Sequence, residues 1–224
     1  METRHLSPTG RRVVSKWRSS RTMLMLLTLS AAMFMVGAAA ANKPRLQQAK
    51  DALEKRVRTT EGTLLARQGE LELARLELTR LNFIVEQSKR YRIPADLAGA
   101  IYDIALSERI DPALAFSLVR VESEFTRTAV SPVGAIGLTQ LMPETAAWLQ
   151  PGITRNQIFE RDVNLRLGFR YLRFMLEQYD GDLQLALLAY NRGPGRVDEI
   201  ISEGGNPSNG YDRRVRDGAR GLMD

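Results

Sequence analysis

Several residue types on which metal sites and nucleophilic sites often depend are scarce in this 224-residue sequence. It contains no cysteine, which excludes disulfides, thiol catalysis and cysteine-ligated metals. Its single histidine, His5, lies in a basic leader far from any folded pattern, which argues against serine–histidine–aspartate and histidine–zinc chemistry. We therefore expect no metal site, and nothing in the sequence indicates a cofactor.

The sequence also lacks any long alternation of polar and apolar residues, the pattern of a half-buried β-strand. Its periodic segments are helical, and 44% of its residues are hydrophobic, an ordinary share for a folded protein. The length is enough for one sizeable domain with appendages. We predict an all-α fold with at most a minor hairpin.

Basic residues are concentrated in the first segment of the chain. Residues 1–22 hold six basic residues and one acid, a net charge of +5, so the total of +6 leaves +1 for residues 23–224. The body of the protein is nearly neutral. The charge therefore gives no sign of nucleic-acid binding and reports on the topology of the leader.

Charged residues are absent from residues 23–41, which directly follow this leader. Such a run is just long enough to span a bilayer, while its most apolar part, residues 23–36, also suits a signal peptide with an alanine-rich cleavage site at residues 39–41. A cleaved signal peptide and a retained membrane anchor both remain open. In either case the positive flank stays cytoplasmic and the residues after 42 lie in the periplasm or another extracytoplasmic space.

Residues 42–91 carry apolar residues every seven positions, which predicts a long helix with a narrow apolar seam. The main series is Val57, Leu64, Leu71, Leu78 and Val85, and the second is Leu53, Thr60, Arg67, Ala74 and Leu81. Thr60 and Arg67 weaken the second series, and two glycines lower helix propensity. A coiled-coil dimer, an antiparallel hairpin, a helix docked on the next domain and a merely solvated helix are alternatives. We interpret residues 43–91 as a spacer or self-association segment.

From residue 92 to residue 224 the pattern becomes globular and helical. Pro94 opens one helix, and Asp111 followed by Pro112 forms an N-cap and first-turn pair that opens the next. Pro143 opens a short helix, and Asp182 opens another that ends at a glycine-rich break over residues 191–195. A longer helix is capped by Asp162 or Asn164, and its expected buried side is Leu165, Phe169, Leu172, Phe174 and Met175.

Glu122 is the strongest candidate for catalysis that periodicity alone offers. Apolar residues recur at helical spacing from Leu114 to Phe125, and Glu122 flanks this stripe. Burial there would disfavour the charged carboxylate and raise its pKa toward the range useful to a general acid near neutral pH. Glu124, further round the helix, is expected to be solvated. A structural helix-end carboxylate is the alternative interpretation of Glu122.

Three separated motifs lie between about residues 93 and 216. The first is Val121-Glu122-Ser123, followed by residues 129–135 (AVSPVGA) and 137–143 (GLTQLMP). The second is Asn164, Gly168, Tyr171 and Leu172, and the third is residues 189–197 (AYNRGPGRV). In this order and spacing they are highly specific, and together they resemble the catalytic domain of lytic transglycosylases of the soluble-transglycosylase type.

The resemblance implies a lysozyme-like fold that acts on peptidoglycan glycan strands, with Glu122 as the catalytic acid. It implies contacts with substrate for further residues, namely Ser123, Ser131, Gln140, Met142, Tyr190 and Asn191. Thr139 and Arg192 replace the methionine and the small residue that are usual in the family. The family's Glu-Thr pair before a C-terminal tyrosine is missing here, and Tyr211 is the residue we assign to that tyrosine's place.

No second carboxylate has a compelling position, so the resemblance implies that Glu122 acts twice. It would protonate the glycosidic oxygen between N-acetylmuramic acid and N-acetylglucosamine, and the substrate's acetamido group would stabilise the positive charge. The carboxylate would then deprotonate the muramyl C6 hydroxyl, which closes a 1,6-anhydro ring. The alternatives are a lysozyme-type hydrolase, which uses two carboxyl groups, and a non-catalytic wall-binding or assembly protein.

Overall fold

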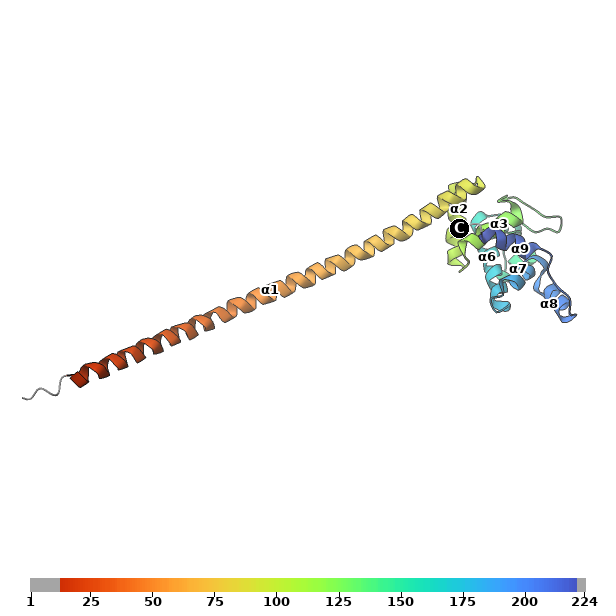
Figure 1. The fold of residues 1–224 in the computed structure, drawn as a ribbon. Helices are drawn as coiled ribbons and strands as arrows, with labels where there is room; N and C mark the ends of the chain where they lie inside the picture. The colour runs from red at the N-terminus through yellow and green to blue at the C-terminus, as the bar shows by residue number, and fades with distance from the viewer. Residues whose placement is uncertain (1–12, 221–224) are drawn as a thin grey trace, which may run out of the picture. The chain divides into compact units, whose positions relative to one another are not determined.

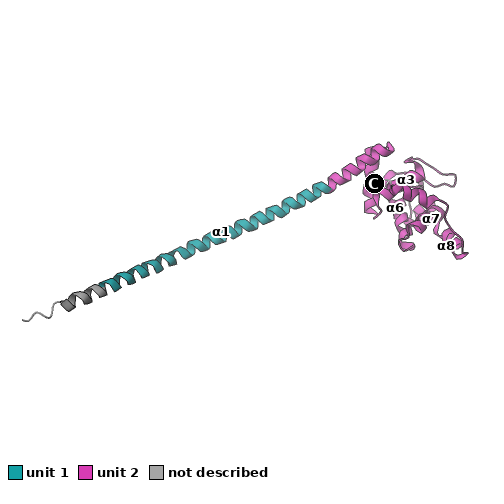
Figure 2. Ribbon diagram, viewed as in Figure 1, with its two compact units in different colours: residues 1–75 teal, residues 76–224 magenta. Residues whose placement is uncertain are grey.

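The computed structural model describes the backbone of residues 13–220 and the side chains of residues 23–220. Over this range the chain forms nine helices and no β-strand, so the all-α prediction is confirmed. The chain divides into two compact units, residues 1–75 and residues 76–224, which are drawn in different colours in Figure 2. The expected leader at residues 1–22 falls largely outside the described residues.

The first helix, α1, runs without interruption from Val13 to Tyr91 (Figure 1). The antiparallel-hairpin alternative for residues 43–91 is therefore wrong, because no turn breaks this helix. Its N-terminal part includes a stretch that, by length and composition, is able to cross a membrane. Pro44 lies inside the helix.

The last turns of α1 belong to the second compact unit, which begins at Leu76 rather than at residue 92. Ile84 and Gln87 are buried in this unit. Arg80 donates two hydrogen bonds to the carboxylate of Asp103, at 2.7 and 2.5 Å. The end of α1 is therefore part of the globular core. For residues 76–91 this agrees with the alternative of a helix docked on the next domain.

Two helices form the centre of the second unit, α2 (Ala95–Ser107) and α3 (Pro112–Ser123). The Asp111 side chain accepts a hydrogen bond from the Leu114 backbone N–H at 3.0 Å, with Pro112 in the first turn, so the predicted cap is present. The middle of α3 is fully buried in the main hydrophobic core. This burial fixes the position of the helix end that carries Glu122.

Three further helices follow the long loop after α3: α4 (Pro143–Leu149), α5 (Arg155–Ile158) and α6 (Arg161–Gln178). The N-cap of α6 is Glu160, so neither Asp162 nor Asn164 is the cap. Phe174 was expected on the buried side of α6, but it is 39% exposed. Its ring packs against Trp148 of α4 instead, with the ring centroids 4.8 Å apart.

The remaining helices are α7 (Leu183–Arg192), α8 (Pro194–Ser202) and α9 (Tyr211–Arg220). Helix α7 begins after Asp182 as predicted, and the Asp182 side chain caps it. Gly193, with φ of 83°, makes the break before α8. The sequence did not reveal α9, which packs against α3 and α7. The Ser117 hydroxyl donates to the Val215 carbonyl at 2.7 Å, and Gly218 lets the two helices approach closely at this point.

The loop between α3 and α4 contains the only extended pairing in the part of the chain that the structure describes. Val130 bridges Ile136, and Ile136 bridges Leu141, both in antiparallel fashion. This corresponds to the minor hairpin allowed for by the sequence. The bridges fold the loop back so that Gln140 and Met142 lie beside the start of α4.

Candidate active site

Glu122 lies in the last turn of α3 and is partly buried. Burial raises the pKa of its carboxyl group to about 7, although a hydrogen bond from Tyr211 and the positive charge of Arg214 act in the opposite direction. The expectation from the apolar stripe therefore agrees with the structure. A carboxyl group with this pKa is protonated in a large fraction of molecules near neutral pH.

The backbone is strained immediately after this acid. Glu124 and Phe125 both adopt positive φ angles, of 48° and 61°, although neither is glycine. Glu124 ends α3 in the left-handed conformation and is exposed, as expected for a solvated residue. Such costly conformations are concentrated at functional sites, where they fix the direction of a side chain.

Tyr211, the first residue of α9, donates a hydrogen bond from its phenol to the Glu122 carboxylate. The side chain is only 2% exposed. Burial, followed by the negative charge of Glu122, raises the pKa of Tyr211 well above its ordinary value, so the phenol keeps its proton. Tyr211 therefore occupies the position beside the acid that the sequence analysis assigned to it.

Tyr190 lies near the end of α7 and also approaches the acid. Its hydroxyl donates to the Thr139 carbonyl at 2.9 Å, and its ring packs against Tyr171 with centroids 5.3 Å apart. Burial, and next the charge of Glu122, raises the pKa of Tyr190 well above its ordinary value. Tyr211 is therefore the phenol bonded to Glu122, while the phenol of Tyr190 is bonded to the loop carbonyl of Thr139.

A groove of about 240 Å³ is lined by Tyr171 and Tyr190, whereas Glu122 and Tyr211 are not among its lining residues. It brings together four of the residues that the sequence analysis proposed for substrate binding, Gln140, Met142, Tyr190 and Asn191. A second hollow shares Thr145 and Tyr171 with the groove and includes the exposed pair Trp148 and Phe174.

Ser123 and Ser131 hydrogen-bond to the main chain. The buried Ser123 hydroxyl donates to the Leu138 carbonyl at 2.8 Å, which joins the end of α3 to the loop before α4. The Ser131 hydroxyl accepts from the Ala135 N–H at 3.0 Å and closes a turn of that loop. In the structure both serines therefore hold the loop that carries Gln140.

Asn164 fixes the same loop from α6, a role that sequence reasoning missed. Its buried side-chain amide donates to the carbonyls of Ile136 and Ile158 at 2.9 and 3.1 Å and accepts from the Thr139 N–H at 2.9 Å. Gly168, one turn further along α6, lies against the Thr139 side chain, leaving no room for a methyl group. The motif of asparagine followed by glycine four residues later was the available signal, because it places both on one helix face.

The end of α7 is tied to the segment before α9. The Asn209 amide donates to the Asn191 side-chain oxygen at 2.9 Å, and Arg192 donates to the Pro207 carbonyl at the same distance. Arg192 replaces the small residue usual in the family, and its hydrogen bond holds the segment before α9 against the end of α7. These bonds connect the groove wall to the segment that delivers Tyr211.

Other acids close to Glu122 in sequence do not share its environment. Glu124 is exposed, and Glu144 is exposed in the first turn of α4. Among residues 23–220, no group of three or more histidine, cysteine, aspartate or glutamate side chains is close enough to hold a metal ion. The chemistry that this arrangement supports is proton transfer by one carboxyl group.

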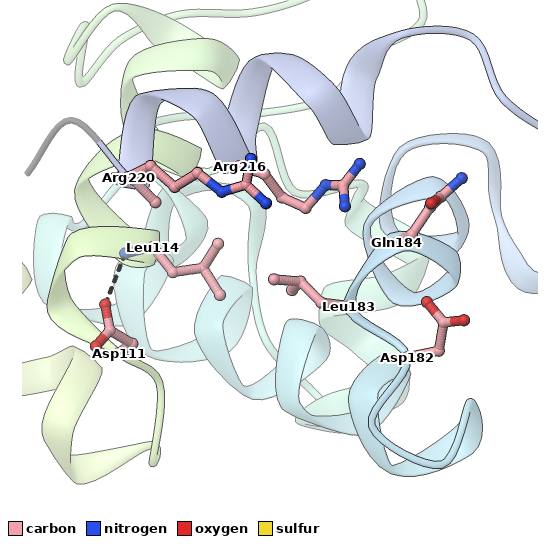
Figure 3. A pocket seen from close by; sticks show the side chains of 8 residues that line it. Asp111, Leu114, Asp182, Leu183, Gln184, Arg216 and Arg220 are labelled. Carbon is pink, nitrogen blue, oxygen red and sulfur yellow. Dashed lines mark hydrogen bonds between the residues drawn. The ribbon is translucent and has the colours of Figure 1, made fainter. Parts of the chain in front are cut away.

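A separate hollow of about 420 Å³ lies between the starts of α3 and α7 and the second half of α9. Figure 3 shows Leu114 and Leu183 pointing toward each other there, with Arg216 and Arg220 above them. Its lining includes none of the residues proposed for catalysis or binding. This hollow is therefore distinct from the Glu122 site.

The raised pKa of Glu122 makes the stability of the domain depend on pH. The pKa rises from 4.5 to about 7 on folding, so the stability linked to the protonated carboxyl is fully present below pH 4.5 and is lost as the pH rises through 7. We expect Glu122→Gln to be more stable than the natural chain by about 3 kcal/mol at pH 8 and about equally stable at pH 4. Urea unfolding at both pH values measures this difference. Glu124→Gln is the control, and an equal effect in both variants would contradict the assignment.

The Transglycosylase SLT domain family matches residues 99–211 of this chain. The soluble lytic murein transglycosylase of Salmonella typhimurium is 36% identical over 98 residues, which cover 39% of this chain and 15% of that protein. The membrane-bound lytic murein transglycosylase C of Edwardsiella ictaluri is 32% identical over 114 residues, covering 43% and 31%. This chain thus spans less than a third of the length of either curated relative.

The fold is also similar to that of a solved lytic transglycosylase structure. The 70 kDa soluble lytic transglycosylase of Escherichia coli is 25% identical, with a TM-score of 0.51, over 61% of this chain and 25% of that one. The family match contains Glu122, the loop after it, α6, the break after α7 and Tyr211. The chain therefore belongs to the family of proteins that carry the transglycosylase SLT domain.

Proposed function

We propose that this protein is a peptidoglycan lytic transglycosylase. It cleaves the β-1,4 bond between N-acetylmuramic acid and N-acetylglucosamine and leaves a 1,6-anhydromuramic acid end. The observation that carries the proposal is the single carboxyl group of Glu122, with its pKa raised to about 7 and its hydrogen bond from the buried Tyr211. The groove lined by Gln140, Tyr190 and Asn191 supports it. Membership of the SLT family and the names of the relatives support it.

In the first step, the protonated Glu122 donates its proton to the glycosidic oxygen as the bond to C1 breaks. The pKa of about 7 favours this role, because the acid is protonated at neutral pH and still strong enough to give up its proton. The acetamido oxygen of the substrate attacks C1 and takes up the developing positive charge. Gln140, Met142 and Asn191 hold the sugar chain in the groove.

In the second step, the Glu122 carboxylate accepts the proton of the muramyl C6 hydroxyl, whose oxygen attacks C1 and displaces the acetamido oxygen. Glu122 returns to its protonated form and no water is consumed. The phenols of Tyr211 and Tyr190 remain neutral through the cycle, since the pKa of each is raised by burial. The hydrogen bond from Tyr211 stabilises the Glu122 carboxylate that exists between the steps.

Analysis of the products tests this function. Purified peptidoglycan is digested with the full chain, and the fragments are weighed by mass spectrometry. Fragments lighter by one water than ordinary reducing-end muropeptides support the proposal. Hydrated ends alone would make the protein a lysozyme-type hydrolase, and binding without fragments would make it a wall-binding or assembly protein.

The proposed site of action is the space outside the cytoplasmic membrane, where peptidoglycan lies. Residues 23–41 either direct export and are removed or remain as an anchor, and the basic residues before them favour a cytoplasmic N-terminus. The same helix continues to Tyr91, so in the anchored form residues 42–91 connect the membrane segment to the catalytic unit.

Tyr211→Phe is expected to move the pH dependence of catalysis. The hydrogen bond from Tyr211 lowers the pKa of Glu122, so its removal raises that pKa and keeps the acid protonated to higher pH. The alkaline limb of kcat/KM is expected to shift upward by about half a unit to one unit. Tyr179→Phe is the matched control, because that phenol bonds to Asp198 at 2.7 Å. An unchanged or lower limb in Tyr211→Phe would refute the role of this phenol.

A further inference from the structure

The helix α1 presents an apolar seam that its own chain leaves exposed. With Val57 as position a of a heptad, Leu64, Leu71 and Leu78 are also a positions, and Leu53, Ala74 and Leu81 are d positions. Exposure of these large a and d side chains ranges from 45% at Leu81 to 62% at Leu53. Exposed leucines at regular seven-residue spacing form a surface suited to another helix with the same spacing.

The domain of the same chain covers a different side of the helix. Phe83, Ile84 and Gln87, which are buried or partly buried, occupy positions f, g and c of the same heptad. The nearby seam residues Leu78 and Val85 remain 59% and 46% exposed. Within the second unit, packing on the last turns of α1 therefore leaves the seam residues Leu78 and Val85 exposed.

We propose that this seam pairs with the same seam of a second copy, as a parallel, in-register, two-stranded coiled coil over residues 53–78. Each a or d side chain would then insert between four residues of the facing helix. The proposal deepens the self-association role considered for residues 43–91. Its orientation rests on the proposed membrane anchor, and its existence does not depend on the catalytic activity.

The charges beside the seam agree with this alignment. In a parallel pair, each g residue faces the e residue five positions later in the partner. Arg56 then faces Glu61, and Glu70 faces Arg75, so both charged pairs have opposite signs. The other two facing pairs, Thr63 with Gln68 and Glu77 with Asn82, contain no like charges.

Arg67 is the one charged residue in the seam, at a d position. Its guanidinium already bonds to the Glu70 carboxylate of the same helix at 3.0 Å, and both side chains are solvent-exposed. The negative charge of Glu70 partly neutralises the positive charge that Arg67 brings into the seam. A polar residue in a seam weakens a coiled coil and restricts its register, so we expect a moderate affinity that needs the two chains to be held close together.

The apolar segment at residues 23–41 supplies both the proximity and the orientation. An antiparallel alignment would also pair unlike charges, such as Glu54 with Arg75, so the charges alone do not choose between the two. Two anchors in one membrane place the N-terminal ends of both α1 helices at the same surface, which permits the parallel pair. Confinement to one membrane also raises the effective concentration of each seam for the other.

Cross-linking through single cysteines tests the arrangement, because the natural chain has none. Leu71→Cys is introduced into the full chain in membranes and oxidised. Since equal a positions face each other in a parallel pair, we expect most of the protein to run as a covalent dimer. Leu73→Cys is the matched control, because Leu73 is 70% exposed but lies at position c, away from the seam; it is expected to cross-link at least about tenfold less efficiently.

Mixed membranes that contain Leu53→Cys chains and Leu78→Cys chains test the opposite orientation. A 53–78 cross-link without a 71–71 cross-link would overturn the parallel arrangement, and equal cross-linking of Leu71→Cys and Leu73→Cys would overturn the seam. In the Leu71→Cys background, Glu70→Arg is expected to lower dimer yield about fivefold or more, and adding Arg75→Glu restores it by reversing the pair. No effect of Glu70→Arg would contradict the proposed register. Dimer yield is read without any lytic assay, so this result stands apart from that of the product analysis.

Discussion

Glu122→Gln is expected to lower the rate of peptidoglycan cleavage by at least about a thousandfold. General acid catalysis by one group contributes about 10²- to 10⁴-fold, and here the same group serves as acid and then as base. Glutamine has nearly the same shape and can still accept a hydrogen bond from Tyr211, but it cannot transfer a proton. The measurement is the release of soluble fragments from labelled cell walls.

Glu124→Gln is the matched control for this experiment. It removes a carboxylate two residues away that is exposed and lies beyond the end of α3. We expect its activity to stay within about twofold of the natural chain, as is usual for surface substitutions that leave stability nearly unchanged. Activity retained in Glu122→Gln, with its fold verified by circular dichroism, would remove the proposed acid.

Asn164→Ala is expected to lower the free energy of unfolding by about 3–5 kcal/mol. The substitution leaves the Thr139 N–H and the carbonyls of Ile136 and Ile158 without their partner in the interior, and each such group costs about 1–3 kcal/mol. For a protein of this size the melting temperature is expected to fall by about 10 °C. Thermal and urea unfolding of the chain measure both quantities.

Asn156→Ala provides the comparison for Asn164→Ala. Asn156 is exposed in the short helix α5, so its substitution is expected to change stability by no more than about 0.5 kcal/mol. Similar losses of unfolding free energy in the two variants would show that the hydrogen bonds of the buried Asn164 amide do not stabilise the fold. The loop that Asn164 holds includes Gln140, so Asn164→Ala is also expected to raise KM before it lowers kcat.

Local chemistry made much of this fold predictable from the sequence. Asp111 with Pro112, Pro143 and Asp182 all open helices where expected, because a cap or a first-turn proline acts within a few residues. The apolar stripe of α3 likewise predicted the burial of Glu122. Phe174 was misplaced because periodicity assigns a helix face, whereas the neighbouring element decides how much of that face is covered.

The parts that were missed depend on contacts between distant residues. Apart from Tyr211, Val215 and Ala219, helix α9 has few apolar residues, so its pattern resembles a solvated segment although these three side chains are buried. The hydrogen bonds of Asn164 join residues 25 and 28 positions apart. Neither periodicity nor spacing reports such a pairing, and the resemblance marked Asn164 without giving its function.

The helix that delivers Tyr211 follows the other parts of the candidate site in the sequence. Tyr211 follows its partner Glu122 by 89 residues, and α9 covers α3 only after that whole length of chain is present. In the proposed topology the N-terminus stays in the cytoplasm and the residues after 42 are exported in chain order. Glu122 therefore reaches the outer side of the membrane before Tyr211 does. A half-translocated chain in that topology therefore holds Glu122 without its hydrogen bond from Tyr211, the bond that lowers the pKa of this acid in the finished domain.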